Sequence, residues 1–323
     1  MAYFQLCNIF AKKISRMRIV GLGNALTDVL ARLHSDECFD EMGLLKGGMQ
    51  LIDEEKLLRI MSVFEGLETT LASGGSAANA VSGVARMGIE SGFIGKIGRD
   101  AYGRFFREDM ERNGVQTLLI EGEQASGCAM TMITPDGERT FGTFLGAAAT
   151  LCAEELSAEM FEGYDILHIE GYLVQDTSLI LRAVQLAKEV GLSVSFDMAS
   201  YNVVKDNYAI IRDLVENYVD ILFANEEEAL AYTGEEPRKA TEILSRYCRI
   251  AVVKCGAQGS FVGCEGIITE VPATPEVRVD STGAGDLYAS GFLYGLSQNC
   301  SLGVCGAIGS LLAGRVIKVI GTK

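Results

Sequence analysis

Hydrophobic and polar positions along the chain follow two alternating patterns. Short apolar runs typical of buried strands, such as "MRIVGLGN" and "VDILFAN", are followed by segments with apolar residues at helical spacing, such as "DEEKLLRIMSVF" and "DTSLILRAVQLAKEVG". This succession runs from residue 17 to the end of the chain and predicts one α/β domain over 17–323. Such a domain contains a central, mostly parallel sheet that is flanked by helices on both faces.

Two stretches, about 28–51 and 115–145, interrupt this pattern. The second alternates apolar and polar residues around the turn sequence Pro135-Asp136-Gly137, which predicts a β-hairpin. We expect these two stretches to form a separate small β-sheet, a lid beside the main sheet.

The two ends of the chain need a separate interpretation. Residues 1–16 are basic and contain no acidic residue, and we expect an N-terminal extension that is not part of the fold. Near the other end, "SLGVCGAIGSLLAG" (301–314) is uncharged but too short to span a bilayer, so a buried helix is expected there.

Composition and charge exclude several classes of function. A formal net charge of −15 argues against a nucleic-acid or anionic-membrane surface, although local backbone dipoles can still bind a phosphate. Nine cysteines without a Cys-x-x-Cys pair indicate reduced thiols and a cytoplasmic location. With only two histidines, His34 and His168, a zinc site or a Ser-His-Asp triad has little support.

The segment "VDSTGAGDLYASGF" (279–292) places a glycine-rich turn directly before an acid and an apolar helix. One interpretation is a tight loop in which Asp286 is a helix-start acid. The other is an anion site, in which the amides of Gly283, Ala284 and Gly285 bind a phosphate and Asp286 accepts a proton. We call residues 283–286 the anion loop.

Two further segments carry candidate binding residues. In "SGGSAANAVSGVARMG" (73–88), glycines allow a ligand to approach the backbone and Asn79 can bind hydroxyls; the alternative is a turn with Ser76 capping a helix. In "NEEEALAYTG" (225–234), Asn225 ends a strand. Asn225 and Glu228 form a capped helix start and have the spacing to hold a hydrated Mg²⁺.

Two common nucleotide motifs are absent. "GLGNALTD" (21–28) has Leu26 where the dinucleotide fingerprint needs its third glycine, and no proton-relay His or Tyr-x-x-x-Lys supports an oxidoreductase. The Gly95-Lys96 pair is followed by Ile97, where a phosphate-binding P-loop needs Ser or Thr.

Three motifs together resemble the PfkB (ribokinase-like) family of carbohydrate and nucleoside kinases. These are "DSTGAGDLYASGFL", "GGSAANAV" and the Asn-x-x-Glu of Asn225 and Glu228, in the family's order; Val81 departs from the small polar residue or alanine that is usual. The resemblance implies a ribokinase-like αβα sandwich whose active site is closed by a small β-sheet lid. It also implies ATP with Mg²⁺ as the phosphate donor.

The resemblance assigns roles by position. Asp286 would be the catalytic base and the amides of 283–285 the anion hole, which suits a loose phosphoryl-transfer transition state. "GNALTD" and "GERTF" are similar to the adenosine-kinase branch. There, the ribose would be held by Asn24, Asp28, Gly75 and Asn79, with Glu170 as a further sugar contact and Arg139 on the transferred phosphate.

The remaining implied roles concern the nucleotide and cations. The resemblance assigns the nucleotide to Asn225, Lys254, Gly256 and Gly259, although Lys254 stands where threonine is common. Asn225 and Glu228 would hold Mg²⁺ through water. Asp280 and Thr282 would border a monovalent-cation (K⁺) site.

The expected function is therefore ATP-dependent phosphorylation of the primary CH2OH group of an adenosine-like nucleoside, with the base on Phe144 and Leu145. A kinase for a free sugar such as ribose or fructose is the alternative, and a non-catalytic sugar- or nucleoside-binding module is more remote. The expected partners are the small-molecule substrate and ATP, with no nucleic acid and no membrane. The chain would be a monomer or a homodimer.

Overall fold

The computed structural model describes residues 17–277 and 279–318; the expected extension at 1–16 lies outside the described residues. Its main feature is a nine-stranded sheet, parallel from β12 to β6 and antiparallel at β13 and β14. The strand order is β14 (Ile267–Val271), β13 (Ser260–Cys264), β12 (Ile250–Lys254), β11 (Ile221–Asn225), β10 (Ser193–Asp197), β9 (Ile166–Glu170), β1 (Ile19–Leu22), β5 (Ser91–Gly98) and β6 (Val115–Gly122).

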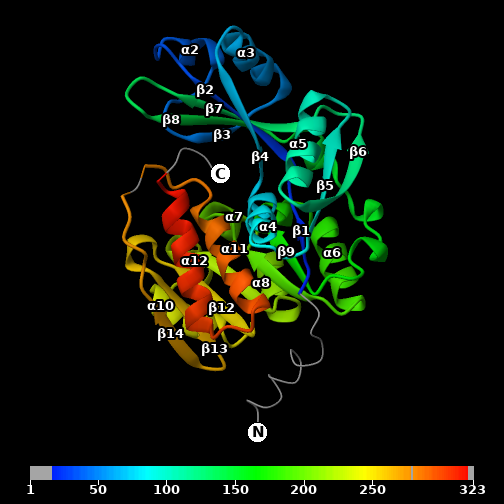
Figure 1. Ribbon diagram of the computed structural model, residues 1–323, viewed down its shortest axis with the longest axis vertical. Helices are drawn as coiled ribbons and strands as arrows, with labels where there is room; N and C mark the ends of the chain where they lie inside the picture. Colours follow the sequence, from blue (N-terminus) through cyan, green and yellow to red (C-terminus); the bar gives the residue numbers. More distant parts are fainter. Residues whose placement is uncertain (1–16, 278, 319–323) are drawn as a thin grey trace.

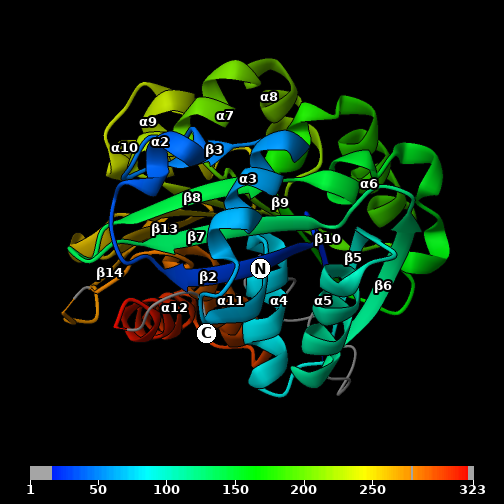
Figure 2. The ribbon, with the colours of Figure 1, turned by 90° about the horizontal axis from the view of Figure 1, so that it is seen from above.

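Helices cover both faces of this sheet, as the sequence predicts (Figures 1 and 2). One apolar cluster packs under α6 (Thr177–Glu189), α8 (Tyr208–Asn217), α9 (Glu226–Thr233) and α10 (Pro237–Leu244). The opposite cluster packs under α4 (Ser76–Arg86), α5 (Ala101–Arg112), α11 (Ala284–Ser297) and α12 (Leu302–Val316). The shorter helical elements are α7 (Tyr201–Asp206) and the 3-10 turns η1 (Gly146–Thr150), η2 (Ala153–Glu155), η3 (Ala158–Met160), η4 (Gly171–Gln175) and η5 (Gly256–Gln258).

A second sheet, the small sheet, follows directly from the carboxyl end of β1. Its order is β3 (Met49–Leu51), β8 (Arg139–Phe144), β7 (Gly127–Ile133), β2 (Leu26–Arg32) and β4 (Thr69–Gly74). One face packs against α2 (Cys38–Met42) and α3 (Glu54–Phe64), which lie on its outer side in Figure 1. The β7–β8 hairpin around residues 135–137 is confirmed, since its strands are antiparallel.

The strands of the small sheet differ from the sequence prediction in two places. Residues 115–122 were assigned to the lid but form β6, which pairs in parallel with β5 at the edge of the large sheet. Its pattern resembles a lid strand because an edge strand is only partly covered. Residues 69–74 were not assigned to the small sheet but form β4, paired with β2.

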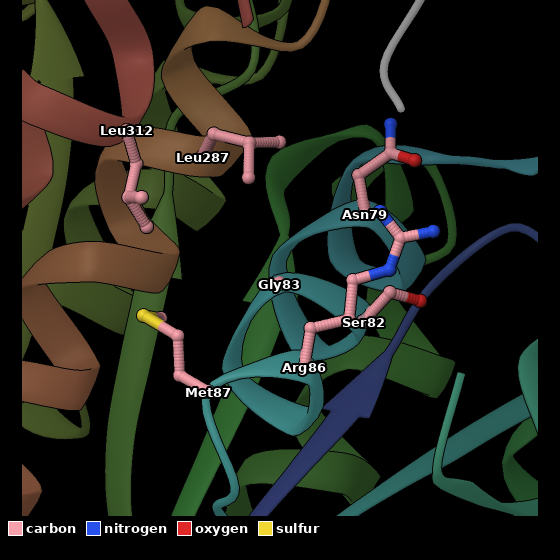
Figure 3. A pocket seen from close by; sticks show the side chains of 7 residues that line it. All are labelled: Asn79, Ser82, Gly83, Arg86, Met87, Leu287 and Leu312. Carbon is pink, nitrogen blue, oxygen red and sulfur yellow. The ribbon is translucent and has the colours of Figure 1, made fainter. Parts of the chain in front are cut away.

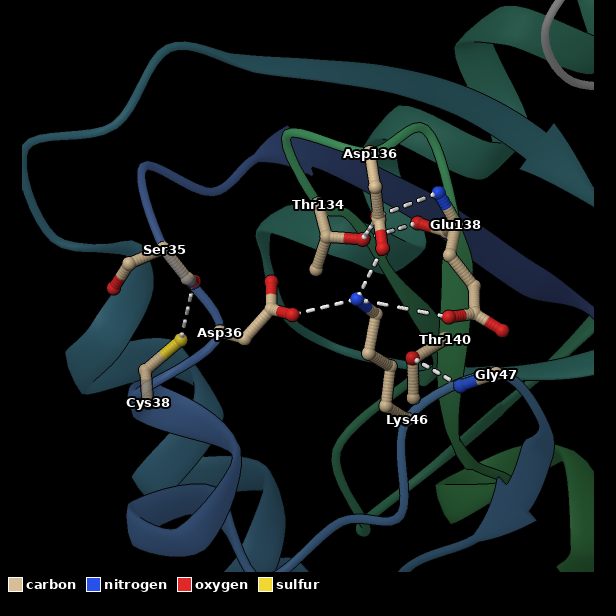
Figure 4. A network of polar contacts seen from close by, with 9 residues as sticks. All are labelled: Ser35, Asp36, Cys38, Lys46, Gly47, Thr134, Asp136, Glu138 and Thr140. Carbon is tan, nitrogen blue, oxygen red and sulfur yellow. Dashed lines mark hydrogen bonds and ion pairs between the residues drawn. The ribbon is translucent and has the colours of Figure 1, made fainter.

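An ion-pair cluster fastens the rim of the small sheet (Figure 4). The Lys46 ammonium lies 2.6 Å from a carboxylate oxygen of Asp36, 2.5 Å from Asp136 in the hairpin turn and 3.6 Å from Glu138. These contacts connect the segment before β3 to the β7–β8 turn, so the far end of the small sheet is cross-linked.

Two helices rich in small residues pack closely beside the large sheet. A Cβ on Gly291 of α11 would lie 2.7 Å from the Ile308 carbonyl oxygen and 2.8 Å from Gly309 of α12, so glycine is required for this approach. The expected helix at 301–314 is present as α12, with a partly buried surface. Within residues 17–277 and 279–318, no helix combines the length and apolar character needed to cross a membrane.

Candidate active site

The first turns of α4 and α11 meet at Asp286. The Ser76 hydroxyl donates to one oxygen of this carboxylate at 2.7 Å, and the Asn79 amide donates to the other at 2.9 Å. The two helices therefore join motifs that lie more than 200 residues apart in the chain. Ser76 does not cap α4, whose N-cap is Gly75, so the capping interpretation of Ser76 is wrong.

Asp286 is the third residue of α11, where a carboxylate benefits from the helix dipole. Burial nevertheless raises its pKa to about 6, because loss of hydration disfavours the charged form; the hydrogen bonds from Asn79 and Ser76 partly oppose this. The carboxylate is therefore ionised at neutral pH, but it is a stronger base than an exposed aspartate.

The anion loop has the backbone conformation that a glycine-rich turn predicts. Gly283 is the N-cap of α11 in the left-handed region (φ 74°), which favours glycine over other residues. The Ala284 amide donates to the Ser281 carbonyl at 3.2 Å, so this predicted anion-hole donor has a partner within the protein. The following amides, of Gly285 and Asp286, belong to the first helical turn, which has no intrahelical acceptors for its N–H groups.

Glu170 and Asn24 form a buried pair beside α4. One Glu170 oxygen accepts from the Asn24 backbone amide at 3.0 Å and from its side-chain amide at 2.6 Å, and the other accepts from the Ala77 amide at 3.0 Å. Burial raises the pKa of Glu170 to about 7. Glu170 is only 1% exposed and its bonds are to the protein, so here it positions Asn24 and the start of α4.

Asp28 of β2 lies against the glycine pair that precedes α4. A Cβ on Gly74 would overlap the Asp28 carboxylate, and one on Gly75, whose φ is 97°, would overlap the Asn24 carbonyl oxygen. The two glycines thus allow β2, β4 and the end of β1 to converge. The structure brings together the four predicted ribose-binding residues Asn24, Asp28, Gly75 and Asn79.

Lys254 and Asp197 form a buried ion pair across the carboxyl edge of the large sheet. The Lys254 ammonium lies 2.7 Å from an Asp197 oxygen, and the two side chains are 15% and 9% exposed. Asp197 ends β10, and the sequence analysis predicted no role for it. Gly256 opens the η5 turn after Lys254, and Gly259, at φ 98°, closes it.

Asn225 and Glu228 form a reciprocal capping box at the start of α9. The Glu228 amide donates to the Asn225 side chain at 2.9 Å, while the Glu228 carboxylate accepts from the Asn225 backbone at 2.7 Å and from its side chain at 2.6 Å. Each carboxylate oxygen keeps a further lone pair. The pair therefore fits an Mg²⁺ held through the ion's own waters and not one bound directly in place of these bonds.

Arg139 of the small sheet pairs with Asp280, just before the anion loop. The other Asp280 oxygen accepts from the Thr282 amide at 3.1 Å and from its hydroxyl at 2.8 Å. Because a guanidinium already neutralises Asp280, this carboxylate and Thr282 do not fit the monovalent-cation site that was expected there. The ion pair instead ties the small sheet to the loop.

A cavity of about 140 Å³ lies behind Asn79, between α4, α11 and α12 (Figure 3). Its lining includes Arg86 on α4, Leu287 on α11 and Leu312 on α12. Of the predicted acceptor-binding residues, only Asn79 lines it. Asp28, Asn24 and Asp286 do not line this cavity.

The two faces of the small sheet correct one expectation. Phe144, which was expected to contact a nucleobase, packs with Cys128 and Met130 on the face covered by α2 and α3. Register places Asp28, Ala129, Thr143 and Leu51 in one cross-strand row on the opposite, inner face. Leu30, Thr131, Phe141 and Met49 form the next row on that face.

Comparisons with known proteins identify similar chains. Residues 42–323 match the family described as pfkB family carbohydrate kinase. An adenosine kinase crystal structure from Sinorhizobium meliloti is 33% identical, with a TM-score of 0.83 and 96% of each chain covered. An uncharacterized sugar kinase from Archaeoglobus fulgidus is 30% identical over 75% of this chain and 96% of its own length. A fructokinase from Klebsiella pneumoniae is 29% identical over 70% and 77%.

Proposed function

The chain belongs to the pfkB family of carbohydrate kinases and is a sugar or nucleoside kinase; from this premise, we propose that it transfers the terminal phosphoryl group of ATP to the primary CH2OH group of an adenosine-like nucleoside. A bond forms between the hydroxyl oxygen and the terminal phosphorus, and the bond from that phosphorus to the bridging oxygen of ADP breaks. The observation that carries this proposal is the partly buried Asp286 carboxylate, held by Ser76 and Asn79 beside the anion loop.

In this proposal, Asp286 orients the acceptor hydroxyl and takes its proton as the new P–O bond forms. Ser76 and Asn79 fix both carboxylate oxygens, so the base does not have to be ordered during the reaction. A pKa of about 6 keeps the Asp286 carboxylate ionised at neutral pH. It also brings the pKa of Asp286 closer to that of the hydroxyl group whose proton it accepts.

Asn79 supports an acceptor that donates a hydrogen bond. Its amide nitrogen donates to Asp286, and its buried side-chain oxygen has no hydrogen-bond partner within residues 17–277 and 279–318. Buried polar atoms are nearly always paired, so this oxygen is available to a donor such as a sugar hydroxyl. Asp28 and the Glu170-held Asn24 lie against Gly74 and Gly75, directly before the helix that carries Asn79.

For the donor, we propose that the amides of the anion loop stabilise charge on the transferred phosphoryl oxygens. Mg²⁺, when bound with ATP, neutralises part of the phosphate charge. Glu228 and Asn225 would hold the ion through its waters.

The inner face of the small sheet favours a nucleoside over a free sugar. Met49 and Leu51 lie on this face, in register with the rows that contain Leu30 and Asp28, and are 56% and 61% exposed. A free sugar offers little apolar surface to such side chains, whereas a nucleobase does. We therefore assign the nucleobase of the substrate to this face, in place of a contact with Phe144.

A coupled ADP-release screen over nucleosides and free sugars, with ATP and Mg²⁺, tests the proposal. The proposed function requires turnover with a nucleoside to exceed turnover with ribose or fructose. A preference for a free sugar would establish the alternative acceptor, and absence of turnover with every compound would support a non-catalytic binding module. Varying K⁺ in the screen should have no specific effect, because Asp280 is paired with Arg139.

The pH dependence of kcat reports on Asp286. We expect kcat to fall below a pH of about 6, where the Asp286 carboxylate becomes protonated. Ser76→Ala removes a hydrogen bond to the charged form, so it should raise the pKa of Asp286 and move this acid limb to higher pH. Ser297→Ala, at the far end of α11, is the control, and an unshifted limb in Ser76→Ala would contradict the assignment.

Variants of the inner face of the small sheet test where the nucleobase binds. Met49→Ser with Leu51→Ser should raise the KM for the nucleoside by about 10-fold, since burial of each large apolar side chain contributes about 1.5–3 kcal/mol at most and only part of this is used. The KM for ATP should not change. Leu58→Ser on α3, which is also exposed, is the control. If the double variant has the same KM for the nucleoside as the wild type, the nucleobase binds elsewhere.

A further inference from the structure

The cavity behind Asn79 has no occupant in the proposed function. It has a volume of about 140 Å³, and Leu287 and Leu312 face the α4 residues across it (Figure 3). Of the residues assigned to the acceptor, ATP or Mg²⁺, only Asn79 lines it. The cavity is therefore available to a different molecule.

Close helix contacts fix the walls of this cavity. α4 meets α11 where a Cβ on Gly83 would overlap the Ser290 hydroxyl, and this hydroxyl donates to the Ala80 carbonyl at 2.8 Å. α11 in turn packs closely against α12 at Gly291. Because tightly packed helices resist rearrangement, the space between them is preformed, as is usual for sites that bind small molecules.

The size and the lining of the cavity favour an apolar group. Leu287, Leu312 and Met87 supply apolar side chains, and the buried Ser82 hydroxyl donates to the Met110 sulfur at 3.3 Å. Water in such surroundings finds few hydrogen-bond partners, so an apolar group displaces it favourably. An apolar cavity of roughly 150 Å³ can bind benzene, and the volume here is nearly the same.

Arg86 adds a positive charge on the exposed side of the cavity. Its guanidinium donates to the neutral side-chain oxygen of Asn113 at 3.1 and 2.9 Å. Among residues 17–277 and 279–318, no carboxylate forms an ion pair with it. The guanidinium keeps further N–H donors, which can form charge-assisted hydrogen bonds to an anion. A singly charged carboxylate suits the site better than a phosphate, because the net charge of the chain is −15.

We propose that this cavity binds a small carboxylate whose apolar body has about the size of a benzene ring. The body would lie between α4, α11 and α12, and the carboxylate would bind Arg86. The bound molecule would contact Asn79, whose amide donates to Asp286 at 2.9 Å. This site is distinct from the proposed acceptor and ATP sites, and the inference does not depend on the kinase function.

A ligand-detected NMR titration of the full chain with benzoate, without ATP or acceptor, tests the proposal. We expect saturable binding with a Kd of about 0.1–1 mM, which is reasonable for so small a ligand. Benzyl alcohol has the same ring without the charge and should bind about 3- to 10-fold more weakly. Acetate has the charge without the ring and should show no saturable binding up to about 10 mM.

Two variants and their matched controls locate the ligand. Leu312→Trp fills the cavity and should weaken benzoate binding at least about 10-fold, whereas Leu311→Trp, at an exposed neighbour that does not line the cavity, should bind as wild type. Arg86→Gln should weaken binding of benzoate about 3- to 10-fold and leave benzyl alcohol unchanged. Arg112→Gln, at the exposed end of α5, is its control.

Two results would overturn the site itself: absence of saturable benzoate binding to the wild type, or wild-type affinity in Leu312→Trp. Wild-type affinity for benzoate in Arg86→Gln would overturn the assignment of the carboxylate. Because Arg86 is exposed, this variant should fold, so the proposal can be tested even if Leu312→Trp does not.

Discussion

Replacing Asp286 by asparagine is expected to lower kcat by at least about 100-fold, because general-base assistance typically contributes about 10²- to 10⁴-fold. Asparagine has the shape of aspartate and can still accept from Ser76, and the Asn79 amide can pair with it after rotation. The variant should therefore fold and bind the non-hydrolysable ATP analogue AMPPNP with nearly the wild-type Kd. Steady-state kinetics with the acceptor from the screen, together with calorimetry, measure both quantities.

The control for this change is Asp53→Asn. Asp53 is also an acid at a helix start, since its side chain accepts from the Lys56 amide at 2.9 Å, but it caps α3 on the outer side of the small sheet. We expect its kcat to equal that of the wild type. A kcat for Asp286→Asn within about threefold of wild type would refute the assignment of Asp286 as base.

Asp28→Ala should act on the acceptor and not on ATP. A hydrogen bond to a charged group contributes about 1.5–3 kcal/mol, which corresponds to roughly a 10- to 100-fold rise in the KM for the acceptor. Asp28 lies on the inner face of the small sheet against Gly74, away from Lys254 and the η5 turn. The KM for ATP should therefore stay within about twofold of wild type.

Asp36→Ala provides the comparison for Asp28→Ala. It removes a carboxylate from the rim of the same sheet, where Asp36 contacts Lys46. This variant therefore shows whether a general loss of stability in the small sheet changes acceptor binding. Its acceptor KM should be unchanged. If Asp28→Ala also leaves the acceptor KM unchanged, the hydroxyls of the substrate are bound elsewhere.

The large sheet was predictable because its buried strands and amphipathic helices alternate over most of the chain. The strands of the small sheet were harder to predict from the sequence. β6 is an edge strand whose partial exposure gives it the pattern of a lid strand, and β4 begins with exposed residues that carry no alternating signal. Phe144 was expected to contact the nucleobase but packs on the face covered by α2 and α3, because neighbouring residues of a strand point to opposite faces and the sequence did not show which face each residue takes.

The individual motifs of the site were also readable, but the contacts between them were not. Ser76 is next to a glycine pair and before a helix, so a cap was the local expectation, and only the packing of α4 on α11 brings it to Asp286. Asp197 and Lys254 are 57 residues apart and meet across a strand. Such pairs depend on the strand order of the sheet, which local sequence does not specify.

The central claim is that the anion loop seats the transferred phosphoryl group opposite an acceptor hydroxyl held at Asp286. A crystal structure of the full chain with AMPPNP, Mg²⁺ and the best nucleoside from the screen tests it most directly. We predict the terminal phosphate within hydrogen-bonding distance of the amides of 283–286, with the acceptor's CH2OH oxygen against the Asp286 carboxylate. A terminal phosphorus bound away from these residues would contradict the account.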